Sequence, residues 1–140
     1  MIERKPILVA DRIFIDSNIA LYIVEPNEPK AERVFEILDE HPVITVQVLN
    51  EFANVARKKH KLDWMEIRDG LEHIVDCCEV LPLTQGVHIK ALEIAEKYLI
   101  GIYDALIVAA AELSGCDTLY TEDLNNGQRI GRVTIVNPFI

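Results

Sequence analysis

Residues 13–18 read Ile-Phe-Ile-Asp-Ser-Asn, so three bulky β-forming residues run directly into one carboxylate and two small polar side chains. A short apolar run followed by turn-forming residues is typical of a strand covered on both faces, as in a parallel sheet. In open α/β sheets, ligands bind beyond the carboxyl ends of the strands, where Asp16 would lie. The alternative is that Asp16, Ser17 or Asn18 only caps the following helix. The stretch therefore predicts a buried strand that ends in either a functional carboxylate or a cap.

The chain has 140 residues, of which 50% are hydrophobic. This length suits one domain that buries about two thirds of the surface of the unfolded chain. We therefore expect a single domain over residues 1–140, with residues 1–11 as an N-terminal extension without an assignable role. The N-terminus has no long apolar segment, and no apolar run approaches the roughly 20 residues of a membrane span. A cytoplasmic protein without membrane contact is expected.

The three cysteines give no sign of a metal or redox role. Cys77 and Cys78 are adjacent, Cys116 is remote, and no CxxC pattern is present. We expect all three to be reduced and buried as small hydrophobic residues.

The net charge of -9 argues against tight non-specific binding to nucleic acid, because such binding comes mainly from neutralising phosphates. This objection weakens if several of the carboxylates bind divalent cations, since a bound metal ion reverses the local charge. Given this charge, nucleic acid is a plausible partner only if several of the acidic residues bind metal ions.

β-branched runs alternate with segments of helical periodicity along the chain. This alternation implies right-handed crossovers onto a largely parallel sheet with helices on both faces, which is an α/β fold with about five strands. A short run at residues 6–9 is compatible with an extra edge strand or a loosely held arm. We expect strands at residues 13–15, 43–46, 78–83, 118–121 and 133–136, and helices at residues 19–24, 29–38, 48–56, 63–75, 87–98 and 103–111.

Three further carboxylates are expected at the same edge of the sheet as Asp16. Glu51 falls in the first turns after the second strand, about 40° from Val55 at the boundary of an apolar helix face. Asp104 heads a helix that is apolar on every side, and Asp123 follows the fourth strand. The structural alternatives are an ordinary rim glutamate at Glu51 and a dipole-stabilising cap at Asp104.

Four carboxylates within several Å repel one another and raise each other's pKa, so such a cluster calls for cations. Oxygen ligands without a partnering His or Cys favour Mg²⁺ or Mn²⁺ over Zn²⁺. One or two such ions can orient and deprotonate a water and stabilise charge on a phosphodiester. Asp16, Glu51, Asp104 and Asp123 are thus the candidate metal-binding and catalytic residues.

The only dense basic cluster is Arg57-Lys58-Lys59-His60-Lys61, at the expected end of the third helix. Cations at a helix C-terminus are favoured by the helix dipole, which is a sufficient structural reason for them. Phosphate contact is the functional alternative, with Arg57, Lys58, Lys59 and Lys61 as candidate RNA-binding residues.

Five short motifs, taken together in their order and spacing along the chain, are informative. Four of them contain a carboxylate at the end of a strand or in the first turns of a helix, and the fifth closes the chain. They are Phe14-Ile15-Asp16-Ser17-Asn18, Val48-Leu49-Asn50-Glu51-Phe52, residues 103–111, Thr121-Glu122-Asp123-Leu124 and Val136-Asn137-Pro138-Phe139. In these segments the chain resembles the PIN-domain family, specifically its VapC-like toxins, and the resemblance spans residues 12–139.

The resemblance implies a three-layer α/β/α fold around a mostly parallel sheet with the first strand central. It also implies a Mg²⁺- or Mn²⁺-dependent endoribonuclease, the toxin of a toxin–antitoxin pair that a small VapB-like antitoxin holds inactive. Family members of this kind often form homodimers through helices. The expected partners are therefore RNA, an antitoxin protein and a second copy of the chain.

Carried over by position, the resemblance makes Asp16, Glu51, Asp104 and Asp123 the acidic set. Thr121 would support this set through a hydrogen bond, and Ser17 or Asn18 would do so more weakly. Some relatives place a further acid just after the fourth-strand motif, where this chain has Asn125 and Asn126. A weaker second metal site is the consequence.

Other function classes share some of these features. A phosphatase or receiver-like domain also gathers acids at a sheet edge, but no strand-terminal Lys and no Asp-x-Asp after the first strand are present. A catalytically silent PIN scaffold that binds RNA or protein is a second alternative. DNA is an alternative substrate, because nothing in the sequence reads the 2′-hydroxyl.

Overall fold

The computed structural model describes residues 12–25 and 28–140 of the chain. Its sheet has the strand order β3-β2-β1-β4-β6-β5. β1 (Ile13–Ile15) lies between β2 (Val43–Thr45) and β4 (Thr118–Tyr120) and runs parallel to both. The expected central position of the first strand is therefore confirmed.

The outer strands complete a mostly parallel sheet. β3 (Glu79–Leu81) is parallel to β2, and β6 (Val133–Val136) is parallel to β4. β5 (Arg129–Ile130) pairs with β6 in the antiparallel direction and was not expected, because two residues give no readable pattern. Gly131 joins the two strands with a φ of 60°, and a Cβ at this position would collide with the Glu112 carboxylate.

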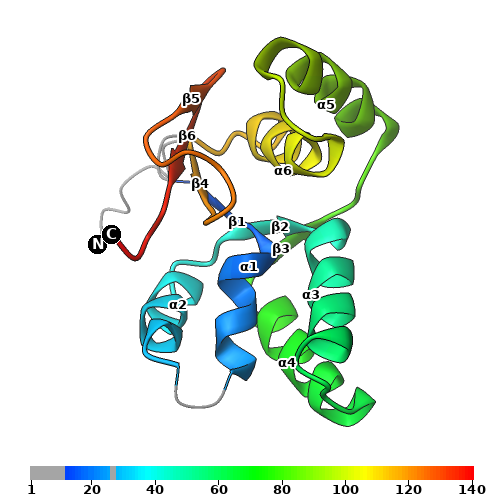
Figure 1. Ribbon diagram of the computed structural model, residues 1–140, viewed down its shortest axis with the longest axis vertical. Coiled ribbons are helices and arrows are strands. Elements are labelled where there is room, and N and C mark those ends of the chain that lie inside the picture. The colour runs from blue at the N-terminus through cyan, green and yellow to red at the C-terminus, as the bar shows by residue number, and fades with distance from the viewer. Residues whose placement is uncertain (1–11, 26–27) are drawn as a thin grey trace, which may run out of the picture.

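Helices cover both faces of this sheet, so the expected three-layer α/β/α arrangement is confirmed. Figure 1 shows α5 and α6 together on one side of the strands and the first four helices on the other side. The helices are α1 (Ser17–Ala20), the 3-10 helix η2 (Leu21–Val24), α2 (Lys30–Leu38), α3 (Val46–Lys58), α4 (Trp64–Cys77), α5 (Gln85–Tyr98) and α6 (Ile102–Leu113).

α6 is the most buried helix, as its all-round apolar sequence predicts. Every residue from 105 to 111 is buried. The helix packs against α5 on one side and against β2, β4 and β6 on the other, which leaves little of its circumference to solvent. Its first turn, which contains Asp104, is thereby held at the edge of the sheet.

Some expected core positions are exposed. Phe35, Trp64 and Val75 are exposed, whereas Val34 and Leu38 on α2 and Ile67 and Ile74 on α4 are buried. The exposed side chains therefore lie at the edges of apolar helix faces whose centres are buried.

The remaining expectations have mixed outcomes. The helix expected at residues 63–75 is present as α4, and Asp63 and Glu66 form a reciprocal capping box at its start. All three cysteines are free, but only Cys116 is buried, and Cys77 and Cys78 are half-buried. The run at residues 6–9 lies outside the described residues. Within those residues, no helix combines the length and the apolar character needed to span a membrane.

Candidate metal centre

The register between β1 and β4 places Asp16 beside Thr121. Ile15 pairs with Tyr120, and the Asp16 amide donates to the Tyr120 carbonyl at 3.0 Å. The next residues along each strand, Asp16 and Thr121, therefore leave the sheet side by side at its carboxyl edge. This is the edge at which parallel α/β sheets bind ligands.

Three of the four candidate acids meet there. One carboxylate oxygen from each of Asp16, Asp104 and Asp123 lies within 4.8 Å of the other two. They come from the end of β1, the first turn of α6 and the segment after β4. Asp16 is 4% exposed, Asp104 is half-buried and Asp123 is exposed, so the cluster opens to solvent on one side.

Asp16 both caps α1 and faces the cluster. Its Oδ1 accepts a hydrogen bond from the Ser17 amide at 2.7 Å, and Ser17 Oγ lies 3.4 Å from the same oxygen. Its Oδ2 accepts from Thr121 Oγ1 at 2.9 Å. Burial raises the pKa of Asp16 to about 6, with further increases from Glu51 and Asp123, and the Thr121 and Ser17 hydrogen bonds oppose this rise. The capping alternative is thus correct for Oδ1 and does not exclude a ligand role.

Thr121 is the hub of a small polar network. It is fully buried, and its Oγ1 accepts from Asn18 Nδ2 at 3.2 Å and from the Asp123 amide at 3.1 Å while donating to Asp16. One hydroxyl has a single donor and two acceptor lone pairs, so every one of its hydrogen-bonding positions is used. Through these bonds the Thr121 hydroxyl joins two of the acids, Asp16 and Asp123, and the Asn18 amide binds the same hydroxyl.

Glu51 stands beside the cluster without belonging to the group of three. Its Oε1 accepts from Gln47 Nε2 at 3.0 Å, one turn earlier on α3. Burial raises the pKa of Glu51, the Gln47 hydrogen bond lowers it, and the charges of Asp104 and Asp123 raise it again. Glu51 is thus close enough to Asp104 and Asp123 for their charges to act on it, and its half-buried carboxylate lies beside the cluster.

Asp104 lies in the first turn of α6, where the helix dipole favours a carboxylate, but it makes no capping hydrogen bond. The N-cap of α6 is Gly101, and among the described residues the Asp104 side chain takes part in no hydrogen bond. Burial, followed by the charge of Asp123, raises the pKa of Asp104. A partly desolvated carboxylate that faces two others and has no donor fits a cation as its missing partner.

A cationic group that the sequence analysis did not single out supports the segment after β4. Lys30 Nζ lies 2.9 Å from Glu122 Oε2, and Tyr22 OH donates to the other oxygen of Glu122. The Lys30 ammonium also lies 4.9 Å from the ring centroid of Phe139, which packs edge-on against Tyr22. This group anchors the residue next to Asp123, and no local pattern links positions so distant in the chain.

The basic cluster is not part of the acidic centre. Lys58 and Lys59 end α3, roughly 10–12 Å along the helix axis from Glu51. Arg57 is engaged locally, because it donates to the Leu62 carbonyl at 3.0 Å and stacks on Trp64. His60 lies 3.3 Å from Glu25. Lys58, Lys59 and Lys61 are exposed to solvent, as is Arg57.

Asn126 has a structural contact of its own. Its Oδ1 accepts from the Asn137 amide at 2.8 Å, and Asn137 Oδ1 accepts from the Phe139 amide at 3.0 Å. These bonds tie the segment after β4 to the closing residues of the chain. They give a local reason for the amide at this position.

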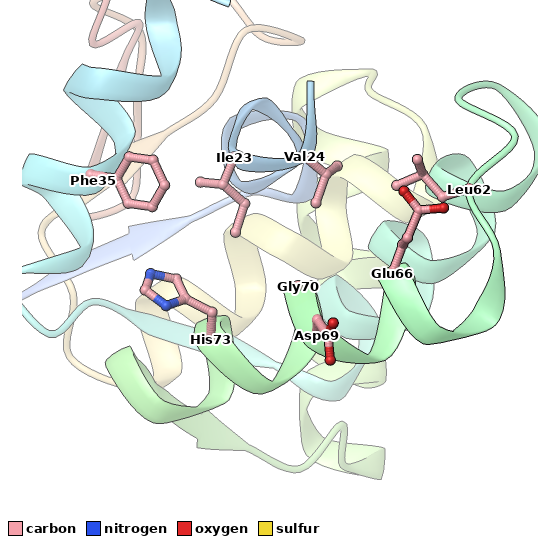
Figure 2. Close-up of a pocket in the computed structure, with 8 residues that line it drawn as sticks. All are labelled: Ile23, Val24, Phe35, Leu62, Glu66, Asp69, Gly70 and His73. Atoms are coloured by element: carbon pink, nitrogen blue, oxygen red, sulfur yellow. The ribbon is translucent and has the colours of Figure 1, made fainter. Parts of the chain in front are cut away.

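A separate hollow of about 410 Å³ lies between η2, α2 and α4. Figure 2 shows Ile23, Phe35 and His73 around it, with Glu66 and Asp69 on the α4 side. The Phe35 and His73 rings meet edge-on at 5.6 Å. The hollow shares no residue with the acidic cluster.

The chain is thus an α/β domain with three layers, and its acidic cluster lies where the parallel strands end. A family model described as PIN domain matches residues 13–131, and the chain belongs to that family. The resemblance noted in the sequence is thereby confirmed. No curated protein matches the chain.

Solved structures with the same fold include proteins from three bacteria. The toxin–antitoxin complex from Klebsiella pneumoniae is 20% identical, has a TM-score of 0.67, and is matched over 91% of this chain and 97% of that one. VapC20 from Mycobacterium tuberculosis, a sarcin–ricin loop cleaving toxin, is 15% identical with a TM-score of 0.66, over 79% and 89%. DNA-bound VapBC from Salmonella typhimurium is 20% identical with a TM-score of 0.69, over 89% and 96%. At these identities the likeness concerns the fold.

Proposed function

We propose that this PIN-domain protein is a metal-dependent endoribonuclease, the toxin of a toxin–antitoxin pair. The observation that carries the proposal is the meeting of Asp16, Asp104 and Asp123, whose oxygens lie within 4.8 Å of one another although they come from distant segments. The fold shared with VapC20, a toxin that cleaves the sarcin–ricin loop, supports the choice of RNA as substrate.

Asp16, Asp104 and Asp123 are the proposed ligands of Mg²⁺ or Mn²⁺, because hard divalent cations take carboxylate oxygens. When bound, such an ion activates a water and neutralises charge on the phosphodiester. Thr121 and Ser17 hold the Asp16 carboxylate in one orientation by hydrogen bonds to its two oxygens. Asn18 holds the Thr121 hydroxyl from the other side.

Glu51 has a different proposed role, which is to orient the attacking water and accept its proton. Its carboxylate is half-buried, hydrogen-bonded by Gln47 and adjacent to the three aspartates. A raised pKa brings a carboxylate closer to the range in which a general base is effective near neutral pH. The family likeness assigns Glu51 to the same acidic set, and a contact with a second ion is the alternative use of its position.

Two protein partners belong to the same proposal. The fold shared with a toxin–antitoxin complex supports a VapB-like antitoxin as one of them. A second copy of the chain is the other, and the exposed Ile89 and Leu92 on α5 provide apolar surface for it. Light scattering of the purified protein, compared with a Leu92→Glu variant, tests the homodimer directly.

The test of activity uses antitoxin-free protein with a structured RNA and a DNA of the same sequence, in Mg²⁺, Mn²⁺ or EDTA. We expect endonucleolytic cutting of RNA in either metal and none in EDTA. Loss of an outer-shell partner of a metal ligand already costs about 10–100-fold, so Asp104→Asn, which removes a ligand, is expected to lower cutting at least about 100-fold.

Differential scanning fluorimetry provides a second readout that does not depend on activity. At a tenfold excess over its dissociation constant, a bound ion stabilises the fold by about 1.4 kcal/mol. We expect Mn²⁺ to raise the Tm of the intact protein but not that of Asp104→Asn. Absence of both cutting and the Tm increase would favour a silent scaffold, and cutting of DNA alone would redirect the proposal to a DNA nuclease.

A further inference from the structure

A groove of about 350 Å³ opens directly beside the acidic cluster. One wall is formed by α3, with the amides of Asn50 and Asn54 one turn apart, and the other wall carries Tyr103 and Leu106 of α6. Glu51 belongs both to this groove and to the surroundings of the metal centre. A ligand in the groove would therefore touch the proposed catalytic residues.

The lining residues have the chemistry of a nucleobase site and not that of a phosphate site. None of the seven lining residues is a cation, so nothing there would neutralise a phosphate. The Tyr103 side chain is an aromatic surface that is 71% exposed, immediately before Asp104 in the chain. Aromatic rings of this kind stack with unpaired bases in proteins that bind single-stranded RNA.

The amides of the groove are available to a base. Among the described residues, the side chains of Asn50 and Asn54 take part in no hydrogen bond. Each amide offers a donor beside an acceptor, which matches the hydrogen-bonding edge of a base. Because the two residues are four apart on one helix, they face the same way.

Gln47 places a buried hydrogen-bond acceptor at one end of the groove, without a partner in the part of the chain that the structure describes. It is only 7% exposed, and its Nε2 donates to Glu51 at 3.0 Å and to the Tyr103 carbonyl at 3.3 Å. Its Oε1 is buried and has no hydrogen-bond partner among the described residues. An unsatisfied buried acceptor is costly, so this end of the groove favours a ligand with N–H groups.

We propose that this groove holds one unpaired nucleobase of the RNA, in the nucleotide next to the phosphate that reaches the acidic cluster. Tyr103 stacks on the base, Leu83 and Leu106 bury its face, and Asn50 and Asn54 bind its edge. The inference rests on the proposed ribonuclease function and adds the residues that choose where the strand is cut. It makes these residues determinants of base specificity, distinct from the acids that perform the hydrolysis.

The test couples a protein change to the removal of a single base. A set of oligoribonucleotides carries an abasic nucleotide at each position in turn around the cleavage site, and each is cut by the intact protein and by Tyr103→Leu. One stacked base is worth about tenfold in affinity, so we expect Tyr103→Leu to raise KM about tenfold on the complete RNA. On the RNA that lacks the base of the groove, the variant and the intact protein should behave alike.

Two further variants sharpen the assignment. The double variant Asn50→Ala and Asn54→Ala should reduce the base preference at that one position to less than twofold, with little change in kcat. Phe35→Leu removes another exposed aromatic side chain, on α2, and should change neither KM nor base preference. If Tyr103→Leu instead changes the oligomeric state and slows cutting of every RNA equally, the groove is not a base site.

Binding of the same RNAs, measured by fluorescence anisotropy in Ca²⁺, separates this inference from the nuclease proposal. If the intact protein cuts RNA but the effect of Tyr103→Leu is the same with and without each base, the two losses are independent. This outcome overturns the base site alone. If no RNA is cut but Tyr103→Leu weakens binding only of RNAs that keep the base of the groove, the nuclease proposal is overturned and the base site remains. Neither binding nor cutting overturns both.

Discussion

The Thr121 hydroxyl donates a hydrogen bond of 2.9 Å to Asp16 Oδ2, although 105 positions separate the two residues in the chain. The parallel pairing of Ile15 with Tyr120 brings them together one residue beyond the strands. Because the same hydroxyl accepts from the Asp123 amide at 3.1 Å, one oxygen atom fixes two of the three clustered acids. The geometry of the candidate metal centre is thus set by the sheet itself.

Removing this hydroxyl should therefore reduce both stability and cleavage. Thr121→Val keeps the shape of the side chain but leaves Asp16 Oδ2, Asn18 Nδ2 and the Asp123 amide without their partner. Buried groups left unsatisfied cost about 1–3 kcal/mol, which is the expected loss in the free energy of unfolding by denaturant titration. We also expect cleavage to fall about 10–100-fold, as for other partners that orient metal ligands.

Thr121→Ser is the matched control, since it keeps the hydroxyl and removes only a methyl group. It should retain most of the cleavage activity and lose about 1 kcal/mol of stability through the lost buried methyl. If Val and Ser at position 121 impair cleavage to the same degree, the hydrogen bonds to Thr121 are not what positions the acids.

The raised pKa of Asp16 predicts an unusual pH dependence for the metal-free protein. In the folded state the pKa is about 6, against an ordinary value of 3.8. Ionising Asp16 therefore opposes folding: the cost is absent below pH 3.8, grows as the pH rises, and is complete above pH 6. At pH 7 it amounts to about 3 kcal/mol.

Asp16→Asn should remove this cost and stabilise the metal-free protein at pH 8. The amide replaces one charged acceptor by a donor, so part of the gain is lost and a net increase of about 1–2 kcal/mol is expected. The gain should shrink as the pH falls and be close to zero near pH 5, where the loss caused by the amide offsets the smaller cost of ionising Asp16, as measured by thermal melting in EDTA. Asp76→Asn, an exposed acid on α4, should not change the pH profile. A lower Tm for Asp16→Asn at pH 8 would count against a crowded acidic site.

The sequence alone was sufficient for the main architecture and for the acids at its edge. A short apolar run such as residues 13–15 fits a buried strand of a parallel sheet, and the polar residues that directly follow it lie at the carboxyl edge of that sheet. The buried helix at residues 103–111 was equally readable, because it is apolar on every side. In these segments local composition and tertiary position agree.

The parts that sequence reasoning missed depend on contacts between distant residues. Gln47 was not singled out, although its place four residues before Glu51 on one helix was a usable signal. The Lys30–Glu122 pair spans 92 positions and has no local pattern. The exposure of Phe35 and Trp64 was also unpredictable, since both lie at the edge of an apolar helix face and the neighbouring helices decide how much of such an edge is covered.

Glu51 and Asp104 should respond differently to the same kind of substitution. Glu51 lies outside the group of three oxygens within 4.8 Å, so Glu51→Gln should keep most of the Mn²⁺-induced rise in Tm while lowering cleavage at least about 100-fold. Asp104→Asn should lose both. The neutral amide of Gln preserves the size of the side chain and its contact with Gln47. Loss of the Mn²⁺ effect in Glu51→Gln would instead place Glu51 among the metal ligands.

The Lys30 ammonium stabilises the segment that carries Asp123, and removing it should loosen that segment locally. The Lys30 ammonium lies 2.9 Å from the Glu122 carboxylate, which also accepts a hydrogen bond from the Tyr22 hydroxyl. In Lys30→Met this carboxylate has no cation beside it. We expect hydrogen exchange of the amides at residues 122–126 to become several-fold faster, and the concentration of Mn²⁺ needed for half-maximal cleavage to rise. Lys90→Met, which removes a cation 3.8 Å from Glu112 on α6, should leave both quantities unchanged. Equal exchange rates in Lys30→Met and the intact protein would show that the segment keeps its position without this ion pair.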